Sequence, residues 1–438
     1  MKILFIHQNF PGQFGHWAPA LAMLGHEVTA LGSRLPAPRL TGVRYWHYRS
    51  EPIRPRSPAN AGGTVSRQDI TQKAVPVASP PDLLRDGPLS AVADSFESKL
   101  ARAACAAQAM EKMKSCGFVP DLVVAHSGWG EALFVKAVFP GARLLVYAEY
   151  FYGSDSGDLG FDPEFSRQSV LSRQRSAINN LHLMQALVEC DAAVSPTYFQ
   201  QAQHPTELQS KISVIHDGID TQRFVPDPRS SVFLANAGVK LTAADEVITF
   251  VARQLEPYRG YHTFMRALPE LLTLRPNARV VIVGGDGVSY GSSPPPGLTW
   301  KQLFLDEVKS KLDDRRVHFV GRVSHETLTK LLQISSVHVY LTYPFVLSWS
   351  VLEAMSMGCL VVASNTAPVR EVIENNRNGL LTDFFDAPAL AQRIAEALAQ
   401  LQALADCRRQ ARQTVVERFD LKSVCLPQLV NWTIDRAS

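Results

Sequence analysis

The segment VHVYLTYPFVLSWSVLEAMSMGCLVVASN, residues 337–365, decides the fold class of this chain. It holds two short apolar, β-rich runs, at 337–342 and 360–364, and between them a stretch with a helical pattern that begins near Ser348 to Ser350. A strand, a helix and a second strand in this order form the repeating unit of a parallel sheet. The segment therefore predicts an α/β architecture in which a loop and a helix start follow the carboxyl end of a strand, where such sheets bind ligands.

The same alternation continues along most of the chain. Two separate sets of strand candidates predict two Rossmann-like units, each a parallel sheet with helices on both faces. The first set lies at 2–7, 27–31, 121–126, 143–148, 192–197 and 212–217, and the second at 247–252, 279–284, 317–321, 337–342 and 360–364.

A polar segment with two prolines, residues 217–231, separates the two sets and predicts a hinge or linker. We therefore expect a first domain over residues 1–220 and a second domain over residues 221–418. A helical stretch over about 419–438 has no strand after it, and we expect it to cross back to the first domain.

Composition excludes several classes of protein. With 438 residues, 46% of them hydrophobic and 19% charged, the chain is too long for one core and too apolar for disorder. A formal net charge of +3 provides no overall field for nucleic acid. Six scattered cysteines form neither a zinc framework nor a disulfide scaffold. The apolar run at 3–6 is shorter than a signal-peptide core, so a cytoplasmic protein is expected.

Two stretches depart from the strand–helix pattern. Residues 34–56 carry six arginines with Tyr45, Trp46 and Tyr48. We favour an exposed strand and a solvated loop here, and the alternative is a peripheral contact with anionic lipid or a polyanionic acceptor. Residues 149–164 are acidic and aromatic. Their carboxylates lack a regular metal spacing, so we expect a loop lining an acceptor cleft rather than a calcium site.

A glycine turn follows the first predicted strand. Gly12 and Gly15 in QNFPGQFGHW (8–17) allow a ligand to approach the backbone closely, and a helix that begins near His16 would offer its positive end. An ordinary turn between a strand and a helix has the same pattern. Both interpretations remain open for this turn.

Two arginines follow the first strand of the second set. Arg253 stands just past that strand and Arg259 lies next to Gly260, so both guanidinium groups can converge on one anion above the strand ends. Two permanently charged forks suit a diphosphate whose charge grows as a glycosidic bond breaks. The alternative is a pair of surface arginines on a loop.

Glu353 lies in the first turns of the helix predicted in 343–365. A carboxylate there can accept hydrogen bonds from both hydroxyls of a ribose, while the preceding loop amides and the helix end meet phosphate. The alternative is a solvated helix residue, which its apolar neighbours Leu352, Ala354 and Met355 disfavour.

Taken in order, these residues resemble the retaining glycosyltransferases of the GT-B fold, specifically glycosyltransferase family 4. The resemblance spans nearly the whole chain. It rests on the glycine turn at 12–15, His126 in VVAHSGWGE, VIHDGID (214–220), Arg253 with Arg259, VGGDG (283–287), HFVGRVS (318–324) and the LEAMSMG block that ends at Gly358.

The resemblance implies a nucleotide-diphospho-sugar bound mainly by the second domain and an acceptor bound mainly by the first, with a cleft between them. Arg253 and Arg259 would hold the diphosphate, Glu353 the ribose, and the backbone near Gly321 to Val323 the base. His126 would lie near the transferred sugar, although a buried histidine at a strand end needs no such role. The donor site implied in this way also includes Gly12, Gly15, Gly285, Arg322, Val323, Phe345, Val346, Leu347, Ser348 and Trp349.

One residue departs from the family pattern. Relatives commonly carry a glutamate eight positions before the one that corresponds to Glu353, and Phe345 stands there in this chain. The departure leaves three possibilities: a donor with fewer hydroxyls at that face, recognition through loop amides near Val346 to Trp349, or lost activity. Arg253, Arg259 and Glu353 argue against lost activity.

The expected function is therefore a retaining glycosyltransferase that moves a sugar from a UDP- or GDP-sugar to a glycan, a lipid-linked saccharide or a small glycoside. The resemblance implies a front-face displacement without a covalent nucleophile, and neither a metal nor another cofactor is expected. Two alternatives remain: a catalytically silent nucleotide-binding partner subunit, and a nucleotide-sugar 2-epimerase of the same fold.

Overall fold

The computed structural model describes residues 1–49, 89–153, 157–166 and 168–437. The chain forms two compact units: Met1–Ser154, Gln168–Val194 and Thr433–Ser438 make the first, and Asp155–Arg167 and Ser195–Trp432 make the second. The domain ranges 1–220 and 221–418 remain a prediction. The Arg-rich segment 34–56 lies outside the described residues from position 50 onward.

The first sheet has the strand order β3-β2-β1-β4-β5-β6-β7, and its pairs from β3 to β6 are parallel. Its strands are nearly continuous runs of apolar side chains, as expected for strands covered on both faces. They are β1 (Lys2–Ile6), β2 (Glu27–Gly32), β3 (Val43–His47), β4 (Leu122–His126), β5 (Arg143–Tyr147), β6 (Ala192–Ser195) and β7 (Ile212–Val214).

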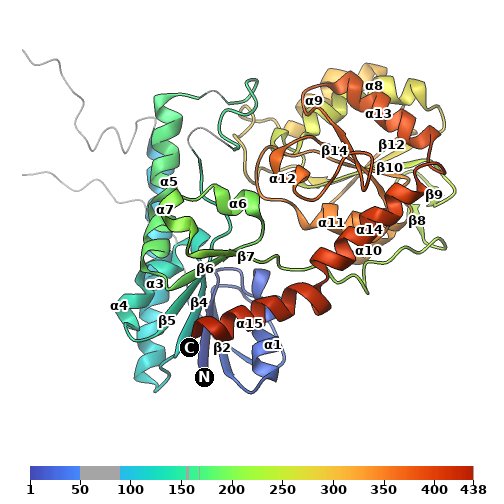
Figure 1. Cartoon of the computed structure of the whole chain (residues 1–438). Helices are drawn as coiled ribbons and strands as arrows, with labels where there is room; N and C mark the ends of the chain where they lie inside the picture. The colour runs from blue at the N-terminus through green and yellow to red at the C-terminus, as the bar shows by residue number, and fades with distance from the viewer. Residues whose placement is uncertain (50–88, 154–156, 167, 438) are drawn as a thin grey trace, which may run out of the picture. The chain divides into compact units, whose positions relative to one another are not determined.

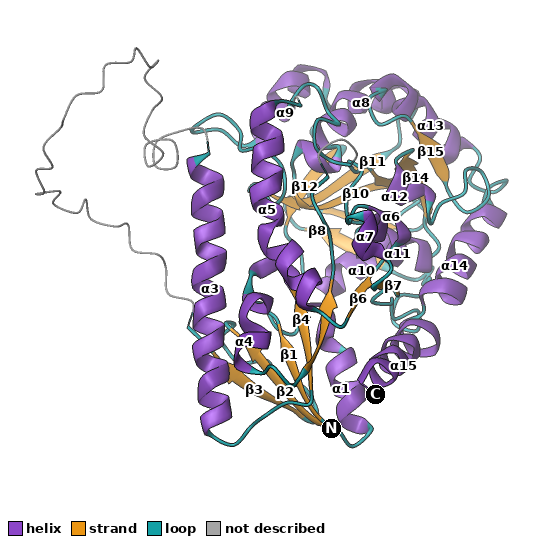
Figure 2. Cartoon of the chain, turned by 60° about the vertical axis from the view of Figure 1, so that its left-hand side comes forward, coloured by secondary structure: helices purple, strands orange, loops and turns teal. Residues whose placement is uncertain are grey.

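Helices cover both faces of this sheet. Figure 1 and Figure 2 show α3, α4 and α5 along one face, and α1 with the end of α15 along the other. Trp17 fixes the end of α15 because its indole Nε1 donates a hydrogen bond to Thr433 Oγ1 at 2.9 Å. The helices are α1 (Trp17–Met23), α3 (Ser90–Ser115), α4 (Val135–Val138), α5 (Val170–Glu189), α6 (Tyr198–Ala202), α7 (Thr206–Gln209) and α15 (Leu426–Ala437).

The second sheet has the order β12-β11-β10-β13-β14-β15, and all its pairs are parallel. The order reverses next to β10, which is the first strand of this sheet in the chain, and such switch points are where parallel sheets bind ligands. The strands are β10 (Val247–Gln254), β11 (Arg279–Gly285), β12 (Val317–Gly321), β13 (Val337–Tyr340), β14 (Leu360–Ser364) and β15 (Leu380–Thr382).

Helices also flank the second sheet on both faces (Figure 1). Short polar residues begin several of them: Ser324 accepts a hydrogen bond from the Thr327 amide and Ser348 accepts one from the Ser350 amide. The helices are α8 (Tyr261–Leu274), α9 (Trp300–Val308), α10 (His325–Gln333), α11 (Trp349–Ser356), α12 (Ala367–Arg370), α13 (Ala387–Ala399) and α14 (Ala405–Phe419).

Strand β15 and an antiparallel hairpin of the second unit were not predicted. Strands β8 (Ser231–Leu234) and β9 (Val239–Thr242) form an antiparallel hairpin. Val232, Leu234 and Leu241 of this hairpin are buried together with Leu331 of α10. The hairpin begins inside the segment predicted to be a polar linker, so the packing of its apolar residues outweighs the local turn signals.

Across the part of the chain that the structure describes, no helix combines the length and the apolar character needed to cross a bilayer. Of the aromatic residues predicted in the Arg-rich segment, Tyr45 stacks on Phe10 with ring centroids 5.9 Å apart. Tyr48 is buried and donates a hydrogen bond to Glu131. Residues 43–47 do form a strand, in which Arg44 and His47 are exposed and the other three residues are half-buried, and a peripheral lipid contact remains a prediction.

Gly260 provides a test of this packing. It begins α8 at a φ of +67°, and an added Cβ would overlap the side chain of Leu341. We expect Gly260→Ala to lose about 1 kcal/mol to backbone strain and about 1–3 kcal/mol more to the overlap. Gly238 is the matched control, since its φ is +63° and nothing lies within 4 Å of the position of its Cβ. Equal thermal midpoints for Gly260→Ala and Gly238→Ala would contradict this prediction.

Candidate functional site

Three polar side chains gather at the carboxyl ends of neighbouring strands in the first unit. His7 directly follows β1, His126 ends β4, and Glu149 follows β5. The two imidazole rings contact each other edge to face, with centroids 4.8 Å apart. His126 Nε2 lies 3.7 Å from a carboxylate oxygen of Glu149. Strands β1, β4 and β5 are adjacent in the sheet, so parallel pairing brings these three groups together.

Backbone amides fix the tautomers of both histidines. The Asn9 amide donates to His7 Nδ1 at 2.9 Å, and the Gly128 amide donates to His126 Nδ1 at 3.0 Å. Each Nδ1 is therefore an acceptor, and a neutral ring carries its proton on Nε2. Burial lowers the pKa of His7 to about 4 and lowers the pKa of His126 well below its ordinary value. Both rings are neutral at pH 7.

Gln13 connects these groups. Its amide oxygen accepts a hydrogen bond from His7 Nε2 at 3.1 Å, and its amide nitrogen donates to Glu149 at 3.0 Å. Gly12 precedes Gln13 at a φ of +47°, and an added Cβ would lie 2.6 Å from His7 Nε2. Gly15 has only ordinary contacts. Gly12 thus lets the turn approach the histidine, whereas packing places no such demand on Gly15.

In the second unit, Arg259 connects the loop after β10 to the start of α11. One guanidinium nitrogen donates to Thr342 Oγ1 at 2.7 Å, to the Val346 carbonyl at 3.2 Å and to the Tyr340 hydroxyl at 3.3 Å. The same hydroxyl accepts a hydrogen bond from the Ser348 amide at 2.9 Å. Ser348 is the residue that caps α11, so a fixed positive charge lies beside the positive end of this helix.

Other predicted donor residues lie at the ends of β10, β11 and β12. Arg253 is exposed near the end of β10, and Arg322 is exposed directly after β12. A Cβ on Gly285 would lie 2.5 Å from the Gln254 amide oxygen and 2.8 Å from Arg322 Nε. The ends of these two flexible side chains thus lie over the backbone at Gly285. The three strands bring Arg253, Gly285 and Arg322 to the same edge of the sheet.

In the loop after β13, side chains and backbone groups that the sequence suggested for donor binding already contact other residues of the protein. Phe345 and Leu347 are each 4% exposed, and the Val346 carbonyl is bonded to Arg259. The Ser348 amide already donates to Tyr340, so it is not the open amide that was considered for donor recognition. Trp349 is 42% exposed and donates from Nε1 to Asp217 at 3.0 Å.

Glu353 is 7% exposed on α11, so the structure does not support the alternative of a solvated helix residue. Its carboxylate lies 3.7 Å from His325 Nε2. Burial raises the pKa of Glu353 to about 7, and the nearby charge of Arg223 opposes this shift. A carboxyl with a pKa near 7 changes its charge within the physiological range, which is typical of residues at functional sites.

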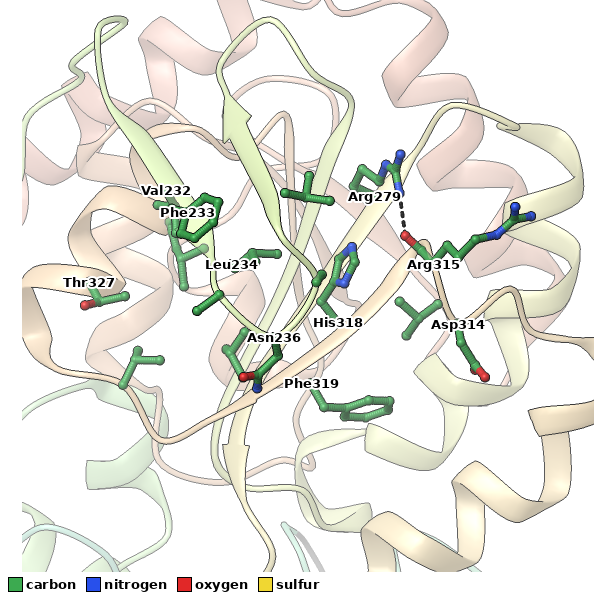
Figure 3. A pocket seen from close by; sticks show the side chains of 17 residues that line it. Val232, Phe233, Leu234, Asn236, Arg279, Asp314, Arg315, His318, Phe319 and Thr327 are labelled. Carbon is green, nitrogen blue, oxygen red and sulfur yellow. Dashed lines mark hydrogen bonds between the residues drawn. The ribbon is translucent and has the colours of Figure 1, made fainter.

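A pocket of about 780 Å³ lies between the β8–β9 hairpin and β12 (Figure 3). Of the predicted donor residues, Val323 lines it, whereas Arg253, Arg259 and Glu353 do not. In Figure 3 the labelled side chains of Phe233 and His318 lie near the hairpin. This pocket is therefore distinct from the arginine and helix-end arrangement described above.

Among the residues that the structure describes, one group has ligand atoms close enough to hold a metal ion: Asp162, Glu164 and His262. His262 Nε2 lies 3.1 Å from Asp162, and the Tyr343 hydroxyl donates to Asp162 at 2.8 Å. Arg266 pairs with Glu164 through two hydrogen bonds of 2.8 Å. A guanidinium already neutralises Glu164, so this group fits an internal ion-pair network better than a cation site.

Sequence reasoning missed His7, Gln13 and Glu149 in the first unit. Each had a signal: His7 ends the predicted strand 2–7, Gln13 stands inside the glycine turn, and Glu149 opens the acidic segment. Their contacts depend on the strand order, which the sequence does not state. In the second unit, the aromatic residues around Phe345 were missed for the same reason.

Two family sequence models match the chain. The model for glycosyl transferase family 4 group matches residues 84–224, and the model for glycosyl transferases group 1 matches residues 236–414. Together these ranges cover most of the chain.

Curated relatives match over shorter spans. D-inositol 3-phosphate glycosyltransferase from Streptomyces avermitilis is 26% identical over 242 residues, which is 51% of this chain and 50% of that protein. Glycogen synthase from Mycobacterium tuberculosis is 25% identical over 261 residues, 58% and 56% of the two chains. The chain thus spans about half the length of the curated relatives that it matches.

Solved structures match over the full length. Sucrose-phosphate synthase from Thermosynechococcus elongatus has a TM-score of 0.67 at 16% identity and covers 100% of both chains. The Anabaena protein HepE, solved with UDP and glucose, has a TM-score of 0.61 at 15% identity and covers 99% of this chain and 98% of its own. These likenesses confirm the predicted GT-B fold.

The two strand-end histidines provide a test in the first unit. We expect His7 and His126 to remain neutral, with the proton on Nε2, from pH 8 down to about pH 5, because burial disfavours their charged forms. Long-range proton–nitrogen NMR spectra of histidine-labelled protein would show this state directly, and the exposed His47 serves as an internal comparison. A titration of either buried ring near pH 6.5 would contradict the assignment.

Proposed function

We propose, from the premise that this chain belongs to the glycosyl transferases group 1, that it transfers a sugar from a UDP- or GDP-sugar with retention of anomeric configuration. The observation that carries the proposal is Arg259, whose guanidinium is fixed beside the capped start of α11. A fixed positive charge and a helix start are the groups that stabilise a departing diphosphate. Relatives of the same fold solved with UDP support a uridine nucleotide as the first donor to test.

The proposed roles follow from charge and burial. Arg253 and Arg259 bind the diphosphate, and Glu353 accepts hydrogen bonds from the ribose hydroxyls. We assign to the Nε2–H of His126, which Glu149 faces at 3.7 Å, a hydrogen bond to a sugar hydroxyl. A neutral imidazole is suited to such a hydrogen bond because it adds no charge beside the forming positive sugar carbon.

The proposed reaction is a front-face displacement. The bond between the anomeric carbon and the diphosphate breaks, and its electron pair stays on the phosphate oxygen. The acceptor hydroxyl forms the new bond on the same face and gives its proton to the departing phosphate. The protein then contributes positioning and countercharge. The two arginines supply this countercharge, so we propose that no metal or other cofactor is needed.

The acceptor is proposed to be a glycan, a lipid-linked saccharide or a small glycoside. Calorimetry with UDP and GDP, combined with a donor-hydrolysis assay and NMR of the product anomer, tests the whole proposal. Nucleotide binding without turnover of any donor would favour a silent partner subunit. Conversion of a UDP-sugar to its 2-epimer would favour an epimerase.

A substitution of Arg253 tests whether this side chain binds the diphosphate. Arg253→Ala should lower kcat/KM by about 10²–10³-fold, because it removes a charge that acts mainly as the leaving group departs. The thermal midpoint should stay unchanged, since this side chain is exposed. Arg315→Ala is the matched control, because the Arg315 side chain is 88% exposed on the same unit. Equal kinetics for the two variants would contradict the role of Arg253.

The raised pKa of Glu353 predicts that nucleotide affinity depends on pH. Ribose hydroxyls donate to the ionised carboxylate, so UDP or GDP affinity should rise by about three- to tenfold from pH 6 to pH 8 as Glu353 ionises around pH 7. Glu353→Gln should remove this rise. The nucleotide phosphate titrates equally in both proteins, so the difference between their calorimetric pH profiles isolates Glu353. Parallel profiles would contradict the proposed contact.

The same shift has a consequence for stability. The folded-state pKa of about 7 lies above the ordinary value of 4.5, so the stability gained by burying the neutral carboxyl is fully present below pH 4.5 and is lost as the pH rises through 7. Relative to the native protein, Glu353→Gln should therefore gain thermal stability between pH 5 and pH 8.

A further inference from the structure

Residues 157–166, here called the strap, follow the first-unit strand β5 in the chain but pack within the second unit. The Phe161 ring lies 5.1 Å from Tyr343 and 5.2 Å from Phe384, measured between centroids. The Phe165 ring lies 5.0 Å from His262 and 5.3 Å from Trp300. The sequence predicted a loop lining an acceptor cleft; the structure places the strap among residues of the second unit, and the acceptor role remains a prediction.

Polar contacts anchor the strap at two further points. Asp162 is 1% exposed and accepts hydrogen bonds from Tyr343 and His262, and Glu164 pairs with Arg266. Burial alone would raise the pKa of Asp162, but these hydrogen bonds and the nearby histidine lower it below its ordinary value. A buried, ionised and fully paired carboxylate fixes the strap firmly.

Asp158 differs from these anchors. It is partly exposed and accepts a hydrogen bond from the hydroxyl of Tyr258, which is 100 residues away in the chain. Tyr258 therefore fixes where this carboxylate lies.

Tyr258 belongs to an aromatic group next to Arg259. Its ring centroid lies 5.7 Å from Tyr290, 4.7 Å from Tyr343 and 5.1 Å from Phe345. The Arg259 guanidinium carbon lies 5.4 Å from the Tyr290 centroid and 5.9 Å from that of Phe345. Asp158 is thus joined, through one tyrosine, to the same group of side chains as the proposed diphosphate arginine.

This combination suits a sugar. A carboxylate accepts hydrogen bonds from hydroxyls, and aromatic rings contact the apolar C–H surface of a pyranose. Small-molecule sites commonly join an apolar aromatic lining to a few oriented polar groups. A sugar linked to a diphosphate at Arg259 would bring its hydroxyls to the neighbouring aromatic group and the carboxylate beside it.

We infer that Asp158 is a donor-specificity residue that accepts hydrogen bonds from hydroxyls of the transferred sugar, on a subsite whose apolar side is the exposed ring of Tyr290, with the buried rings of Tyr258 and Phe345 packed behind it. The inference rests on the proposed function. Relatives commonly carry a glutamate at the position of Phe345, and in this inference Asp158 of the strap supplies a carboxylate in its place. The substrate class is a nucleotide-bound hexose with free hydroxyls on the face toward Asp158.

The test compares kcat/KM on a donor panel of UDP-glucose, UDP-galactose, UDP-N-acetylglucosamine and GDP-mannose. The best donor is then compared with its deoxy analogues. Asp158→Asn keeps the size of the side chain but removes its charge, and it should lower kcat/KM for the best donor at least tenfold. It should also abolish the native preference for the intact donor over one deoxy analogue, while UDP or GDP affinity measured by calorimetry stays unchanged.

Glu164→Gln is the matched control, because it weakens a strap anchor without touching the aromatic group. It should lower the thermal midpoint and leave the ratios between donors unchanged. If Glu164→Gln altered those ratios as strongly as Asp158→Asn, or if Asp158→Asn kept the native ratios, the assignment of Asp158 would be overturned and the proposed function would stand. If the native protein bound UDP or GDP but turned over no donor, the proposed function itself would fall, and this inference with it.

Discussion

The second unit depends on the placement of one guanidinium. Arg259 is half-buried, and its hydrogen bonds to Thr342, Val346 and Tyr340 join the loop after β10 to the loop after β13. Gly260 makes this possible, since no side chain could stand there against Leu341. An arginine held in this way loses little further entropy when it binds an anion, because its rotamer is already fixed. The same contacts that stabilise the loop therefore preorganise it.

The two units place their functional side chains in the same way, but the side chains differ in charge. In each, parallel strands bring side chains from distant segments to one edge of a sheet. In the first unit, burial keeps His7 and His126 neutral, and amides fix their tautomers. In the second unit, Arg253 and Arg259 contribute guanidinium groups at the strand ends. A diphosphate needs permanent positive charge, whereas sugar hydroxyls need oriented neutral donors and acceptors.

Much of this arrangement could be predicted from the sequence. Alternating apolar runs and helical periods predicted both parallel sheets, and the helix start near Ser348 and the burial of Glu353 followed from local patterns. The hairpin β8–β9 and the link from Gln13 to Glu149 could not be predicted, because they depend on which strands become neighbours. The strap was harder still, since its position within the second unit rests on aromatic contacts that no local period encodes.

Phe345 explains why a carboxylate would have to come from elsewhere in the chain. Its ring is 4% exposed and lies within 5.1 Å of the Tyr258 and Tyr290 centroids. A glutamate in that place would lose its hydration among aromatic rings, and an ionised carboxylate without a close partner is costly to bury. Asp158 avoids this cost because it stays partly exposed and is oriented by the Tyr258 hydroxyl. In this subsite the aromatic rings and the carboxylate therefore come from different segments of the chain.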